Sequence, residues 1–107
     1  MSTPSTKTIH TQGSEGTEPK KNDTVQIAYL GTMGEGDDKT EFDRNADGLT
    51  FRVGMGSVIP CWDDQIMTMN VGEKATISCP ADTAYGEQQV GKIPPNTDLT
   101  FEVWRKK

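Results

Sequence analysis

The stretch Pro60-Cys61-Trp62-Asp63-Asp64-Gln65-Ile66-Met67-Thr68-Met69-Asn70-Val71-Gly72 is the one part of the chain with helical spacing of apolar residues. Trp62, Ile66 and Met69 fall at positions i, i+4 and i+7, which places them in a single apolar stripe. Pro60 is typical of the first position of a helix, and the segment from Asn70 to Gly72 is typical of a helix end. Because a helix of about two turns is not stable alone, we expect it to pack on other elements.

Around this helix, apolar and polar residues alternate as they do in half-buried β-strands. The apolar members are Val25, Ile27 and Tyr29; Leu49, Phe51 and Val53; Ala75, Ile77 and Cys79; and Leu99, Phe101 and Val103. Four such strands and one short helix predict an α+β fold, in which an antiparallel sheet wraps around the helix.

The remaining segments are predicted to be loops and a tail. Residues 31–47 and 85–96 are long and polar, and long loops in a small domain are often binding elements. Residues 1–20 contain too few apolar side chains to form a core, so we expect a largely flexible N-terminal tail before one domain over residues 21–107. Residues 8–10 (Thr-Ile-His) are a candidate first edge strand of that domain.

Composition excludes several classes of function. The chain has 107 residues and a formal net charge of −5, which argues for one domain and against binding to nucleic acid or anionic membrane. It contains no membrane-spanning stretch, and residues 1–20 lack the apolar core of a secretory signal. We therefore predict a cytoplasmic monomer in which Cys61 and Cys79 are reduced thiols.

The chain lacks the motifs of the common hydrolases, phosphate-binding enzymes and metalloenzymes. No G-x-S-x-G, Walker lysine loop, H-E-x-x-H or Cys–His ligand pairing is present, so we expect no cofactor and no metal. The single histidine, His10, falls in the predicted tail, which argues against general acid–base catalysis by imidazole.

Aromatic and branched residues are spread over the whole predicted domain. They are Tyr29, Phe42, Val58, Ile59, Trp62, Tyr85, Ile93 and Phe101. Each one taken alone is most simply explained as a core residue. Periodicity does not distinguish a packed core from the lining of a pocket, so both interpretations stay open at this level.

Several short motifs occur together in a characteristic order. They are Tyr29-Leu30-Gly31, Glu41-Phe42-Asp43, Val58-Ile59 followed by Trp62, Met69-Asn70-Val71-Gly72-Glu73-Lys74-Ala75, Tyr85-Gly86, Ile93-Pro94-Pro95-Asn96 and Leu99-Thr100-Phe101-Glu102-Val103. In order and spacing they resemble the FKBP family of peptidyl-prolyl cis–trans isomerases, which bind tacrolimus and rapamycin. The resemblance runs from about Ile9 to Val103 and implies a half-barrel of antiparallel strands around one short helix.

The resemblance also implies a pocket with Trp62 as its floor. The implied ligand-binding residues are Tyr29, Phe42, Asp43, Leu49, Val58, Ile59, Trp62, Tyr85, Ile93 and Phe101, and all of these except Leu49, Val58, Ile59 and Ile93 form the implied catalytic set. The Tyr85 hydroxyl and the Ile59 amide would donate hydrogen bonds to ligand carbonyls. Pro60, Cys61, Gln65 and Leu49 depart from the family's usual residues, and we expect these changes to affect macrolide affinity more than the fold.

The implied function is rotation of X–Pro bonds in client proteins, without covalent or acid–base chemistry. In the drug-bound state the family also binds calcineurin or the TOR kinase, so both are implied partners. One alternative is a non-catalytic module that docks a protein partner through the pocket rim, and another is a β-domain with no pocket.

Overall fold

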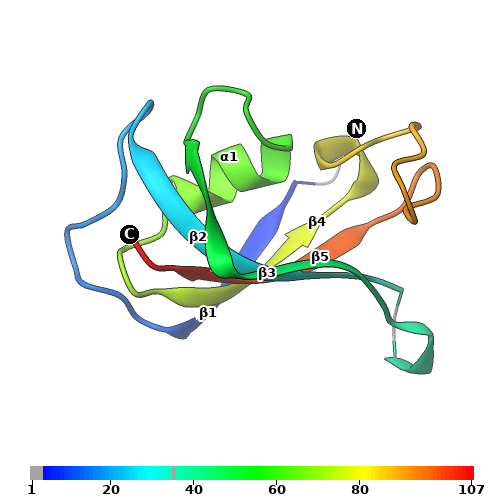
Figure 1. The fold of residues 1–107 in the computed structure, drawn as a ribbon, viewed down its shortest axis with the longest axis horizontal. Coiled ribbons are helices and arrows are strands. Elements are labelled where there is room, and N and C mark those ends of the chain that lie inside the picture. Colours follow the sequence, from blue (N-terminus) through cyan, green and yellow to red (C-terminus); the bar gives the residue numbers. More distant parts are fainter. Residues whose placement is uncertain (1–3, 35) are drawn as a thin grey trace.

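The computed structural model describes residues 4–34 and 36–107, and its main element is one antiparallel sheet (Figure 1). The strands are β1 (Thr6–Thr11), β2 (Thr24–Met33), β3 (Thr40–Arg52), β4 (Lys74–Cys79) and β5 (Leu99–Arg105). Their order across the sheet is β1-β4-β5-β2-β3, so β1 and β3 are its edges and the sheet is not closed into a barrel.

Helix α1 (Pro60–Ile66) packs against one face of this sheet, as Figure 1 shows. Two short 3₁₀ turns, η1 (Gly36–Asp38) and η2 (Ala81–Thr83), lie in the connections. Trp62 and Ile66 of the helix, and Met69 just beyond it, are buried together with alternate residues of β2, β4 and β5. The helix ends at Ile66, earlier than the Asn70-to-Gly72 end that the sequence predicts, and Met69 reaches the core from the turn that follows. The predicted α+β fold, a sheet around one short helix, is therefore confirmed.

The prediction of a long loop over residues 31–47 is wrong. Strand β2 continues to Met33, and β3 begins at Thr40 and pairs with β2 along its length. Most side chains of β3 are exposed because it is an edge strand, and the pairing with β2 shifts register twice. A strand of this kind lacks the two-residue alternation on which the sequence prediction relies. The predicted loop over 85–96 is confirmed, with turns and one isolated bridge between Val90 and Ile93.

The N-terminal segment lies against the rest of the domain. Strand β1 contains residues 8–10 and pairs with β4. Farther along, the Thr17 amide donates to Asn70 Oδ1 at 3.0 Å, and Arg105 Nη1 donates to the Thr17 carbonyl at 2.6 Å. The predicted flexibility of residues 1–20 stays a prediction, and residues 1–3 lie outside the described residues.

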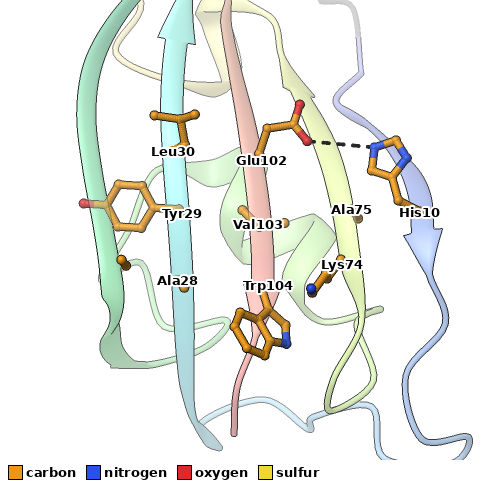
Figure 2. A pocket seen from close by; sticks show the side chains of 10 residues that line it. His10, Ala28, Tyr29, Leu30, Lys74, Ala75, Glu102, Val103 and Trp104 are labelled. Carbon is orange, nitrogen blue, oxygen red and sulfur yellow. Dashed lines mark ion pairs between the residues drawn. The ribbon is translucent and has the colours of Figure 1, made fainter.

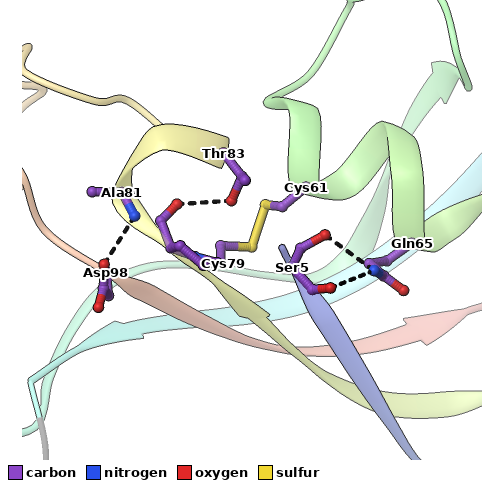
Figure 3. The surroundings of a disulfide bond; sticks show 8 residues. Ser5, Cys61, Gln65, Cys79, Ala81, Thr83 and Asp98 are labelled. Atoms are coloured by element: carbon purple, nitrogen blue, oxygen red, sulfur yellow. Dashed lines mark hydrogen bonds between the residues drawn. A yellow bond between two sulfur atoms is a disulfide. The ribbon is translucent and has the colours of Figure 1, made fainter. Parts of the chain in front are cut away.

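Cys61 and Cys79 form a disulfide bond, so the prediction of two reduced thiols is wrong (Figure 3). Their Cα atoms are 5.7 Å apart, a separation that a disulfide spans readily. Cys61 lies in the first turn of α1 and Cys79 ends β4, and both side chains are completely buried. A separation of 18 residues in sequence gives no sign of this proximity, which the packing of helix on sheet creates.

In the part of the chain that the structure describes, no helix combines the length and the apolar character needed to cross a membrane.

Candidate functional site

Helix α1 places Trp62 at the centre of an aromatic cluster. Ile59 is extended (φ −61°, ψ 150°) and Pro60 is the first helical residue, so the helix begins abruptly and Trp62 falls in its first turn. The indole is 4% exposed. Tyr29 and Phe101 meet it edge to face, with ring centroids at 5.0 and 5.3 Å, which is a favoured arrangement of aromatic rings.

Phe42, on β3, extends the aromatic cluster next to Gly31 of β2. Its ring meets Phe101 edge to face at 5.6 Å. Gly31 of β2 leaves room for both rings, since a Cβ atom at this position would lie 2.6 Å from Phe42 Cζ and 2.9 Å from Phe101 Cε1. Both contacts are closer than carbon atoms approach, so the aromatic cluster depends on a glycine here.

The aromatic cluster opens on a cavity of about 230 Å³. Its lining residues are Tyr29, Phe42, Asp43, Leu49, Ser57, Val58, Ile59, Trp62, Tyr85 and Phe101. The structure therefore brings together every predicted ligand-binding residue except Ile93, which is 4% exposed and part of the core. The predicted contact of Ile93 with a ligand stays a prediction. Ser57 is an addition that the sequence does not single out, and its one signal is its position before Val58.

The two tyrosine hydroxyls at the cavity are held in their neutral form. Tyr29 donates to Asp43 Oδ2 at 2.7 Å. Burial, this hydrogen bond and the charge of Asp43 raise the pKa of Tyr29 from 10.0 to about 12. Burial, followed by the charge of Asp43, also raises the pKa of Tyr85. Both hydroxyl groups therefore remain protonated at neutral pH.

Several hydrogen-bond donors at the cavity have no partner within the described chain, among them the buried Nε1 of Trp62. The Tyr85 hydroxyl and the Ile59 amide belong to lining residues, and neither donates to another described residue. The first comes from the loop over 85–96 and the second from the segment before α1. These donors are available to carbonyl oxygens of a bound peptide.

A larger cavity, about 440 Å³, lies on the other face of the sheet. Figure 2 shows Trp104, Leu30 and Lys74 in front of the strands, with helix α1 behind them. Trp104 is 40% exposed, and the amines of Lys74 and Lys106 lie 4.7 and 5.1 Å from its ring. This surface has one exposed aromatic residue and an exposed ion pair at its edge, whereas the smaller cavity has five aromatic lining residues and hydrogen-bond donors without partners in the described chain. We therefore take the smaller cavity as the candidate site.

The cavity lining contains one carboxylate, Asp43, and no histidine, cysteine or lysine. His10 lies on β1 and borders the outer cavity instead. Between residues 4 and 107, residue 35 apart, no three His, Cys, Asp or Glu side chains gather as a metal site. The side chains present are suited to binding an apolar ring, and to holding carbonyl groups beside it.

Comparison with known proteins identifies the family. Residues 15–104 match the family model of the FKBP-type peptidyl-prolyl cis-trans isomerases. The chain belongs to this family. The FK506-binding protein 1A of Emericella nidulans is 46% identical over 89 residues, which are 79% of this chain and 80% of the relative. The peptidyl-prolyl cis-trans isomerase Fkbp12 of Drosophila melanogaster is 40% identical over 95 residues, or 85% of each chain.

Membership of the FKBP family confirms the resemblance and the enzyme class predicted from the motifs. A further relative, the FK506-binding protein 2 of Aspergillus oryzae, is 44% identical over 86 residues, and the matched region covers 62% of that protein. Within this FKBP chain, the cavity beside Trp62 is the candidate active site.

Proposed function

We propose that this chain catalyses cis–trans rotation of X–Pro peptide bonds in the cavity beside Trp62. One observation carries the proposal: a 230 Å³ cavity has five aromatic lining residues, and two of the donors at it, the Tyr85 hydroxyl and the Ile59 amide, come from separate segments and have no partner in the described chain. Family membership supports the same reaction.

The residues at the cavity are suited to a reaction without proton transfer. Rotation about an X–Pro bond is slow because resonance gives the C–N bond partial double-bond character, with a barrier of about 20 kcal/mol. The planar amide is more charge-separated than the twisted transition state. An apolar cavity therefore destabilises the planar state more, and a difference of about 4 kcal/mol accelerates rotation about a thousandfold.

The free donors supply the second contribution, which is distortion of the bound peptide. We infer that the proline ring lies on the indole of Trp62. The Tyr85 hydroxyl and the Ile59 amide then hold carbonyl groups on either side of it. Carbonyls held in fixed positions keep the amide away from planarity, and binding energy from the rest of the peptide offsets this cost.

The size of the cavity limits what it encloses. Sites for drug-sized ligands occupy about 300–1,000 Å³, whereas this cavity occupies about 230 Å³. It accommodates one ring with its neighbouring amide, and the rest of a peptide or macrolide lies over the rim.

Tacrolimus and rapamycin are the proposed macrolide ligands. Calcineurin or the TOR kinase would then recognise the drug-bound rim, which includes the exposed residue Leu49.

We propose that the protein is a monomer. Its predicted cytoplasmic location stays a prediction, and the Cys61–Cys79 disulfide favours an oxidising compartment instead.

The alternative function is a binding module without catalysis, which would use the same cavity and donors. NMR exchange spectroscopy on a Leu-Pro peptide, with and without rapamycin, separates the two. Accelerated exchange that rapamycin abolishes supports the isomerase. Peptide or rapamycin binding without acceleration supports the module, and binding of neither would contradict both. Fluorescence of a Trp104→Leu variant reports rapamycin binding from Trp62 alone, since the chain has two tryptophans.

A further inference from the structure

One side of the cavity is formed by the loop that joins β3 to α1. Ser57, Val58 and Ile59, at the end of this loop, line the cavity. Residues 55–57 are exposed, and the side chain of Met55 at the tip is 51% exposed. Packing therefore contributes little to fixing the position of the loop, and segments with few buried contacts open easily.

The side chain of Asp63, in helix α1, holds this loop. The Gly54 amide donates to Oδ1 of Asp63 at 2.8 Å, and the Gly56 amide donates to Oδ2 at 2.8 Å. Within the described chain, no other side chain forms a hydrogen bond with residues 54–58. A carboxylate that accepts from two backbone amides makes charge-assisted hydrogen bonds, which are roughly twice as strong as neutral ones.

The two glycines give the loop the shape that this contact requires. Gly54 has φ +78° and Gly56 has φ +73°, values that other residues rarely adopt. Glycine also loses more conformational freedom on folding than any other residue. A loop with two glycines therefore has many alternative conformations, and the Asp63 carboxylate favours the one observed.

We propose that Asp63 is a positioning residue for the isomerase site. By holding Gly54 and Gly56, it fixes the wall that follows, so that Val58 and the free Ile59 amide are in place before a peptide binds. Asp63 does not line the cavity and acts only through the loop. The inference rests on the proposed function and assigns a role within it.

The neighbouring Asp64 offers a matched control. It lies in the same helix and is exposed, and its side chain forms no hydrogen bond or ion pair with another described residue. Asp63→Asn and Asp64→Asn each remove one negative charge at adjacent positions. Asp63→Asn, however, also places an NH₂ group against one of the two loop amides.

Kinetics and peptide binding of these variants test the proposal. Because the loop must be ordered on binding when Asp63 no longer holds it, Asp63→Asn is expected to raise KM and the peptide Kd about tenfold, with kcat nearly unchanged. Asp64→Asn is expected to stay within about twofold of the wild type. Asp63→Glu retains the carboxylate and should give an intermediate KM. Equal KM and Kd for the Asp63 and Asp64 variants would overturn the inference.

Amide exchange in the wild-type protein gives a second measurement that needs no variant. The Gly54 and Gly56 amides are expected to exchange with solvent at least about tenfold more slowly than unbonded amides of an exposed loop. Unprotected amides would overturn the inference, even if Asp63→Asn failed to fold. If Asp63→Asn does not fold, the KM and Kd of Asp63→Glu are compared with those of Asp64→Asn instead. A wild-type protein that binds the peptide without accelerating its exchange would contradict the proposed isomerase, and the Kd values would then decide the role of Asp63.

Discussion

The Tyr29 hydroxyl joins β2 to β3 at the cavity, through a 2.7 Å hydrogen bond to Asp43 Oδ2. The same carboxylate acts on Tyr85, whose pKa is raised first by burial and then by the charge of Asp43. One acidic side chain therefore has two effects: it accepts the hydrogen bond of the Tyr29 hydroxyl, and it adds to the effect of burial in raising the pKa of Tyr85. Tyr85 is thus the tyrosine available to a ligand carbonyl.

Replacing Asp43 with asparagine should lower the pKa of Tyr29 from about 12, yet leave it above the ordinary value of 10.0, because burial is the largest cause of the shift. Ultraviolet absorbance of tyrosinate measures this titration, and the chain has two tyrosines to assign. A Tyr29→Phe variant identifies the remaining transition as that of Tyr85. Identical titration curves for wild type and Asp43→Asn would contradict the assignment.

The raised pKa of Tyr29 also predicts how stability depends on pH. Between pH 10.0 and about 12 the folded state keeps a proton that the unfolded state loses. The stabilisation is therefore fully present below pH 10 and is lost as the pH rises towards 12. Urea unfolding across this range should show a smaller decline in Tyr29→Phe than in the wild type, and equal declines would contradict the prediction.

The two tryptophans provide a direct comparison of the cavity with the outer face of the sheet. Trp62→Leu removes the indole beside the cavity, and we expect kcat/KM to fall at least about tenfold and stability to fall by about 2–4 kcal/mol. Trp104→Leu changes a side chain that is 40% exposed and should leave kcat/KM unchanged. Peptide exchange kinetics and urea unfolding measure both effects. A Trp62→Leu variant with wild-type turnover would remove this residue from the site.

Breaking the disulfide should destabilise the domain while leaving the fold intact. The bond closes a loop between residues that are 18 apart in sequence, and chain entropy predicts a loss of about 3 kcal/mol on reduction. Urea unfolding with and without dithiothreitol measures this difference. A double variant, Cys61→Ala with Cys79→Ala, should unfold at the same urea concentration under both conditions. Two titratable thiols in the protein without reductant would show that the bond is absent.

The sequence predicts best those elements that have one buried face. Strands β2, β4 and β5 and helix α1 each show a regular apolar repeat, because half of their side chains enter the core. Strand β3 is an exposed edge with shifts in its pairing. Only its second half, at Leu49 and Phe51, keeps the alternation, and its first half resembles a loop in sequence.

The site illustrates the same limit. Its aromatic lining could be identified by family motifs, whereas the contacts that support it depend on three-dimensional proximity. In sequence, Asp63 is one of two adjacent acidic residues, and the two cannot be distinguished. In the structure only Asp63 reaches the amides of Gly54 and Gly56. Cys61 and Cys79 are likewise brought together by the packing of the helix on the sheet.

The last prediction concerns the ion pair between β1 and the segment before β4. Lys7 Nζ lies 2.6 Å from Glu73 Oε2, and the two side chains are 9% and 1% exposed. Lys7 also donates to the Thr68 carbonyl at 2.9 Å. Lys7→Met leaves the buried carboxylate of Glu73 without its partner. Removing one member of a buried ion pair costs about 3–5 kcal/mol, so urea unfolding should show a loss of that size.

Lys20→Met provides the control, because Lys20 is exposed and forms no ion pair with another described residue. Both lysines belong to the segment for which the sequence predicts a largely flexible tail. A large effect of Lys7→Met alone would mean that β1 is a stabilising part of the domain, and deletion of residues 1–11 should then destabilise it at least as much. Equal, small effects of the two substitutions would contradict the role of the ion pair. They would also leave the tail interpretation as the better description of residues 1–11.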